Sequence, residues 1–155
     1  MGRLRLFGEL VEAGGAVEGG GSGGGGGHQI ARVVRTAGDY TTTNTSFVDI
    51  DTNNLVINLT TGDSWVLLLL LSACYVSSLK YGCFDFTIDG VRQGQVKGVQ
   101  YVQAVYDADV QIAWLAPVTA GSHVFRPQWR VTGGVGTLRA SSAEAPLLFA
   151  VLELQ

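Results

Sequence analysis

Apolar and polar residues alternate along much of the chain after residue 28, with the two-residue period that half-buried β-strands show. In residues 55–60 and 82–89 at least every second side chain is apolar, which predicts strands with one face on a core. Asp89 and Gly90 follow the second of these runs and form a strong hairpin-turn signal. The pattern therefore predicts a hairpin that begins with residues 82–89.

Residues 65–71 break this alternation, because they form the most apolar stretch of the chain. The stretch is far shorter than the roughly 20 residues that span a bilayer, so it predicts no membrane segment. We interpret it as a buried strand that continues to about residue 76. A continuous apolar run is typical of a strand covered on both faces. Since one face of every strand in a monomeric sandwich meets water, the second apolar face indicates a contact between subunits.

Other strand candidates follow at short, regular spacing, in residues 29–35, 46–51, 101–106, 110–115, 125–131, 137–141 and 147–154. Proline cannot donate to a β-ladder, so Pro127 predicts an edge, a bulge or a kink in its strand. Many short strands at this spacing, with no helix after residue 28, predict an all-β fold. The expected architecture is an antiparallel jelly-roll sandwich.

The composition changes sharply near residue 28. Half of the 22 glycines lie between Gly8 and Gly27, and residues 19–27 are glycine interrupted only by Ser22. Such a run is expected to be a flexible tether. A short apolar cluster with helical spacing precedes it and supplies the candidate docking contacts Leu4, Leu6, Phe7, Leu10 and Val11. We therefore divide the chain into a Gly-rich docking arm (1–27) and a jelly-roll domain (28–155); a disordered tail is the alternative for the first part.

Charged residues are scarce, at 15% against about 25% in a typical soluble domain, whereas hydrophobic residues make up 46%. Such a chain has little charge to cover its surface, which favours oligomerisation or placement in a larger assembly. An ordinary β domain with an apolar surface is the alternative. The net charge of −3 argues against a nucleic-acid partner, and the dispersed basic residues provide no patch for a membrane surface.

Few residues of the chain are candidates for catalysis or for metal binding. His28 follows the tether, where nothing holds it, and His123 lies at a turn before a strand, so we predict no catalytic residue and no enzyme. Asp49 and Asp51 have the i, i+2 spacing that could gather oxygen ligands for a hard cation. Polar outer faces of strands have the same spacing, and we predict neither a metal nor a cofactor.

The two cysteines, Cys74 and Cys83, are too few for a disulfide framework. A bridge across a hairpin and two reduced thiols both remain open. Reduced cysteines that pack as small apolar residues are the favoured interpretation.

Several segments, taken in their order along the chain, resemble those of a known protein family. They read YTTT at 40–43, SFVDID at 46–51, LVINL at 55–59, FDFTIDG at 84–90, AGSHVF at 120–125, QWRV at 128–131 and VLEL at 151–154. This order resembles the TNF/C1q-like jelly-roll domain of phage tail-fibre and capsid-decoration proteins, over roughly residues 40–155. Pro127 departs from the apolar or long residue expected at that position.

The resemblance implies a homotrimer whose subunits pack about an axis through aromatic and aliphatic faces. A one-residue parity error would exchange core and axis positions, so we do not assign the candidates to one or the other. The candidate core or trimer-axis residues are Trp65, Leu67, Leu69, Tyr75, Phe84, Phe86, Tyr101, Tyr106, Trp114, Phe125 and Trp129.

The resemblance also implies a non-enzymatic structural protein located in the virion. Small size and the lack of a shaft or repeat favour a capsid decoration (cement) protein, whose arm would dock on the major capsid protein or another virion protein. The alternative is a tail-fibre or receptor- or carbohydrate-binding jelly-roll module, with its site in loops such as residues 93–100.

Overall fold

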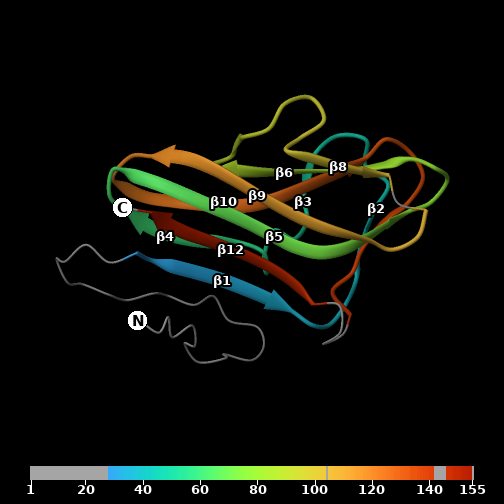
Figure 1. Cartoon of the computed structure of the whole chain (residues 1–155), viewed down its shortest axis with the longest axis horizontal. Helices are drawn as coiled ribbons and strands as arrows, with labels where there is room; N and C mark the ends of the chain where they lie inside the picture. Colours follow the sequence, from blue (N-terminus) through green and yellow to red (C-terminus); the bar gives the residue numbers. More distant parts are fainter. Residues whose placement is uncertain (1–27, 104, 142–145, 155) are drawn as a thin grey trace, which may run out of the picture.

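The computed structural model of the chain describes residues 28–103, 105–141 and 146–154 (Figure 1). The predicted arm, with Leu4, Leu6, Phe7, Leu10 and Val11, lies outside these residues. Within the described ranges the chain forms strands and no helix. It follows that no membrane-spanning helix is found there.

The strands form two antiparallel sheets, which we call sheet A and sheet B. Sheet A contains β1 (Ile30–Arg35), β2 (Tyr40–Thr42), β5 (Ser64–Val76), β9 (Ala108–Val118), β11 (Gly136–Leu138) and β12 (Leu147–Leu154). Sheet B contains β3 (Val48–Asp49), β4 (Ile57–Thr61), β6 (Tyr81–Ile88), β7 (Val91–Arg92), β8 (Gln100–Gln103) and β10 (Gly121–Val131).

The long strands follow jelly-roll connectivity. In sheet A their order is β1-β12-β5-β9, and in sheet B it is β4-β10-β6-β8. The chain crosses between the sheets from β4 to β5, from β5 to β6, from β8 to β9, from β9 to β10 and from β10 to β12. Such crossings are typical of a jelly roll, which is built of two Greek keys. The structure thus confirms the predicted all-β antiparallel sandwich.

The core lies between the two sheets and is rich in aromatic residues. Phe84 of β6 stacks on Trp129 of β10 with ring centroids 6.3 Å apart, and Phe86 of β6 stacks on Phe149 of β12 across the sandwich at 6.1 Å. All four side chains are almost completely buried. Burial of each such side chain contributes about 2–3 kcal/mol, so this cluster fixes how the two sheets pack.

Pro127 lies in the middle of sheet B, within the continuous strand β10, and not at a sheet edge. Its carbonyl accepts a hydrogen bond from the backbone N–H of Ile50, so its carbonyl and ring nitrogen face β3 and β4 and not β6. β4 pairs with β10 as far as Phe125, and β3 pairs from Gln128 onward. The missing N–H therefore falls between two short strands, which is why proline is tolerated there.

Three predicted strands are shorter in the structure. Residues 46–51 contribute only β3, because the Asp51 carboxylate accepts the backbone N–H groups of Asn53 and Asn54 and forms a turn. Residues 101–106 contribute only to β8. Residues 137–141 contribute only to β11, because Asp39 accepts the N–H of Ala140 and draws the chain out of the sheet.

Candidate interaction surface

The outer surface of sheet A is the most unusual feature of the molecule. Even-numbered residues of β5, such as Leu68 and Leu70, are buried in the core, and odd-numbered residues point away from it. These odd-numbered residues are also apolar, so β5 presents Leu67 and Leu69 to the outside. The continuous apolar run in the sequence is therefore a strand with two apolar faces.

Neighbouring strands continue this surface across the sheet. Leu67 lies opposite Leu115 of β9 on one side and Leu152 of β12 on the other, and Leu152 lies opposite Ile30 of β1. We call the whole surface the apolar face. It consists of Ile30, Val34, Trp65, Leu67, Leu69, Leu71, Ala73, Ala113, Leu115, Pro117, Leu148, Ala150, Leu152 and Leu154.

The apolar face lies at the upper end of the range of apolar patches that monomers expose. Four strands spaced about 4.8 Å apart, over nine residues of about 3.4 Å each, cover roughly 500–600 Å². The largest apolar patch of a typical monomer is about 300–600 Å² and is often functional. Trp65 is 51% exposed and Leu115 is 49% exposed, so the face includes large side chains that water reaches. A surface of this kind is typical of a protein–protein contact.

The outer side of sheet B is polar by contrast. Asp49 of β3 accepts hydrogen bonds from Arg126 at 3.2 Å and from Gln128 at 2.7 Å, both on β10. The ring of Phe47 lies under the guanidinium of Arg92, 3.9 Å from the ring centroid, with the guanidinium of Arg130 at 5.2 Å. The two outer surfaces of the sandwich are therefore chemically different.

Asp85 of β6 anchors the loop that covers part of sheet B. Its carboxylate is completely buried and accepts hydrogen bonds from the backbone N–H of Gly94 at 2.8 Å and from Nε of Arg92 at 2.8 Å. Gly98 approaches so closely that a Cβ atom there would overlap the carbonyl of Phe84. These contacts hold residues 93–99 against the sheet.

Ion pairs also fasten both ends of the sandwich. Nδ1 of His123 lies 2.7 Å from Asp89, and the hydrogen bond raises the pKa of His123 and lowers the pKa of Asp89. At the other end Arg139 contacts Asp39 at 2.9 Å and Asp107 at 3.0 Å. The hydrogen bonds from Ala140 and Arg139 lower the pKa of Asp39. These charged groups hold loops in place.

Both cysteines are buried and free. Cys74 lies in the core on β5, and burial raises the pKa of its thiol to about 12. Cys83 precedes Phe84, which points into the core, so the Cys83 side chain points out of sheet B. The two thiols therefore point in directions that do not favour a bridge, in agreement with the predicted reduced cysteines.

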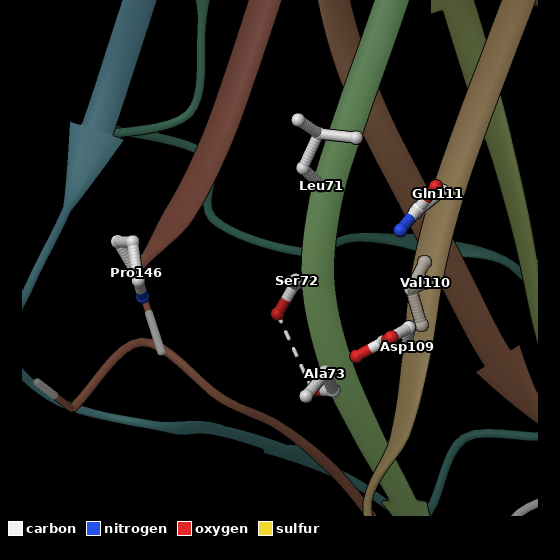
Figure 2. A pocket seen from close by; sticks show the side chains of 7 residues that line it. All are labelled: Leu71, Ser72, Ala73, Asp109, Val110, Gln111 and Pro146. Atoms are coloured by element: carbon white, nitrogen blue, oxygen red, sulfur yellow. Dashed lines mark hydrogen bonds between the residues drawn. The ribbon is translucent and has the colours of Figure 1, made fainter. Parts of the chain in front are cut away.

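A shallow hollow lies at one end of the apolar face, with a volume of about 370 Å³ (Figure 2). Leu71, Ser72 and Ala73 of β5 line it together with residues 109–111 of β9. Pro146, just before β12, lies on the opposite side of it in Figure 2. The hollow is open and extends the apolar face toward Asp109.

The structure separates the predicted core or axis residues into groups. Phe84, Phe86, Phe125 and Trp129 are in the core, and Trp114 packs against it. Trp65, Leu67 and Leu69 lie on the apolar face. Tyr75 is partly buried on the outer side of β5, Tyr101 is exposed on β8, and Tyr106 is exposed in the loop before β9.

Sequence reasoning missed several residues of the apolar face. The contributions of β1, β9 and β12, including Ile30, Leu115 and Leu152, were not among the candidates. A signal was present in residues 147–154, where nearly every position is apolar at both parities, as in residues 65–71. Two such strands in one sheet place two apolar outer faces side by side.

No protein-family model matches this chain, and no curated protein matches it.

Proposed function

We propose that this protein is a non-enzymatic structural subunit that assembles into a homotrimer through its apolar face. The observation that carries the proposal is the contrast between the two outer surfaces: that of sheet A is apolar, and that of sheet B bears ion pairs. A soluble monomer gains nothing from a second apolar face, whereas an assembly removes it from water.

The size of the face supports self-association. A stable interface buries about 800 Å² on each partner, and the roughly 500–600 Å² of the apolar face with its rim approaches this area. Full burial of a fully exposed leucine contributes about 1.5–3 kcal/mol, against a cost of association of about 4–15 kcal/mol. The leucines of the face are at most 49% exposed in the single chain, so assembly needs most of them, together with Ile30, Val34 and Trp65, to offset that cost.

We further propose that the trimer is a virion component, most specifically a capsid decoration protein. β1 begins beside the end of β12, with Ile30 opposite Leu152 (Figure 1), so the β1 strands of three chains packed in parallel through the apolar face would all begin at one end of the trimer. Three arms on one trimer bind through effective concentration even when each is weak. The major capsid protein or another virion protein is the proposed partner of residues 1–27.

Binding to expanded, undecorated capsids tests this location. We expect the full chain to bind, and a variant that lacks residues 2–27 to stay trimeric but not to bind. A matched variant with Leu6, Phe7 and Leu10 changed to serine keeps the tether and tests the docking contacts alone. Equal capsid binding by all three proteins would contradict the docking role, and no binding by the full chain would contradict the assignment to the capsid.

One observation favours the alternative, a tail-fibre or receptor- or carbohydrate-binding module. The rings of Tyr81 and Tyr101 meet edge to face on the outer side of sheet B, with centroids 5.6 Å apart, and Tyr101 is 52% exposed. Exposed tyrosines provide rigid, amphipathic contact area. Adsorption to host cells that is lost in Tyr101→Ala would support this alternative.

A further inference from the structure

The apolar face carries two opposite charges at its two edges. Arg32 of β1 points outward between Ile30 and Val34. Asp109 of β9 points outward beside Ala73 and lines the hollow shown in Figure 2. Neither side chain forms an ion pair with another residue of the described ranges, although the neighbouring Asp107 does so with Arg139.

These two charges cannot meet within one subunit. β1 and β9 are separated by β12 and β5, so three strand spacings of about 4.8 Å place the two backbones about 14 Å apart across the sheet. Arg32 is level with Leu69, and Asp109 is level with Ala73, which adds an offset along the strands. The face of a single copy therefore has a positive edge and a negative edge.

We propose that Arg32 of one copy pairs with Asp109 of the next copy around the assembly. The inference rests on the proposed self-association, and a second copy of this chain is the occupant to which it commits. In a cyclic, head-to-tail assembly one edge of each subunit meets the opposite edge of its neighbour. The two edges of the apolar face are complementary in charge, which suits such a closed ring when its axis is inclined to the strands, so that Arg32 and Asp109 lie at the same height along it.

The physical reason is the cost of burying a charge. Covering the apolar face would desolvate Arg32 and Asp109, and an unpaired buried charge is strongly unfavourable. Pairing the two across the interface removes this penalty and fixes the register of the neighbouring subunit. The hollow beside Asp109, lined by Leu71, Ala73 and Pro146, leaves space for the long arginine side chain.

Charge reversal tests the pair. We expect Arg32→Asp and Asp109→Arg each to raise the concentration at which the full-length trimer dissociates by at least tenfold, measured by light scattering on dilution. The double variant, with both charges exchanged, should return to within about threefold of the unchanged protein. Lys97→Asp, which changes the net charge as Arg32→Asp does but lies in the loop on the outer side of sheet B, should have no effect.

The controls separate the failure of the pair from that of the proposed assembly. If Leu67→Asp dissociates the trimer while the charge reversals leave it unchanged, the pairing is wrong and the assembly stands. If both single reversals weaken the trimer but the double variant is weaker still, the pairing is also wrong. If the unchanged protein is monomeric at all concentrations, both proposals fail.

A cross-linking test reports the geometry directly. In Arg32→Cys/Asp109→Cys the new thiols are too far apart for a short link within one chain, and the native Cys74 and Cys83 are buried. A short bifunctional thiol cross-linker, whose spacer replaces the reach of the arginine side chain, should therefore produce covalent trimers on a denaturing gel, and each single variant should not. Covalent dimers as the end product would show a two-fold contact and overturn the head-to-tail arrangement, as would the absence of any cross-link.

Discussion

His123 of β10 and Asp89 in the turn after β6 form a hydrogen-bonded ion pair, with Nδ1 of the imidazole 2.7 Å from a carboxylate oxygen. The other ring nitrogen lies 2.9 Å from the carbonyl oxygen of Thr119, so both nitrogens face acceptors. Only the doubly protonated ring can donate to both. The pair therefore links the hairpin after β6 to the turn before β10 and favours the charged histidine.

This arrangement predicts how stability depends on pH. The pKa of His123 is raised above 6.5 in the folded state, because Asp89 and the carbonyl of Thr119 accept hydrogen bonds from its ring N–H groups. The contribution of His123 to stability is therefore complete below pH 6.5 and disappears as the pH rises through the raised value. The pKa of Asp89 is lowered below 3.8, so its contribution is lost as the pH falls through that lower value. We expect about 0.5–1 kcal/mol more stability at pH 5.5 than at pH 8.5 from this pair.

Urea unfolding of His123→Gln provides the measurement. The variant should lose most of this difference between pH 5.5 and pH 8.5, whereas His28→Gln should keep it. A pH profile that is unchanged in His123→Gln would show that the contact does not stabilise the fold.

Asp85→Ala should destabilise the protein by about 2–3 kcal/mol. The substitution removes the acceptor of the Gly94 N–H and leaves the guanidinium of Arg92 without its buried partner. Asp63→Ala removes the exposed carboxylate that accepts one hydrogen bond, from the backbone N–H of Ala120, and should cost about 0.5–1 kcal/mol. The free energy of unfolding of both variants is measured by chemical denaturation. An equal decrease in the two would show that the buried Asp85 carboxylate stabilises the fold no more than an exposed one does.

Gly98 and Gly38 offer a matched test of close backbone approach. Both have φ of +83°, but a Cβ at Gly98 would overlap the Phe84 carbonyl, whereas Gly38 has open space around it. Gly38→Ala should cost about 1 kcal/mol, from backbone strain alone. Gly98→Ala should cost several times as much, because the loop must leave sheet B. Similar midpoints of thermal unfolding for the two variants would refute the described loop packing.

Adjacent leucines of β5 test the two-faced strand. Leu68 points into the core and Leu67 points into the apolar face, so Leu68→Asp should prevent folding, because it buries an unpaired charge. Leu67→Asp should retain the β-type circular dichroism spectrum. The opposite result, with Leu67→Asp unfolded at low concentration and Leu68→Asp folded, would show that the assigned parity is reversed.

The core and the sheet architecture could be predicted from the sequence to a large extent. Phe84 and Phe86 alternate with polar residues, and this period determines which side faces inward. The residues of β5 and β12 could not be assigned in the same way, because both parities are apolar there. The fold alone shows that Leu67 and Leu152 share one outer surface.

Other features depend on contacts between distant segments. Asp85 and Asp89 have the same spacing as any polar strand face, yet one anchors a loop through Arg92 and Gly94 and the other pairs with His123. The opposite edges of the apolar face, with Arg32 and Asp109, are defined by the order β1-β12-β5-β9, which no local pattern contains.

The mass of the purified full-length protein in solution tests the central claim most directly. Light scattering across a hundredfold range of concentration should give three times the chain mass of 16.4 kDa, and Leu67→Asp should give a folded particle of one chain mass. A single chain mass for the unchanged protein over the whole range would contradict the proposal that the apolar face is covered by sister copies.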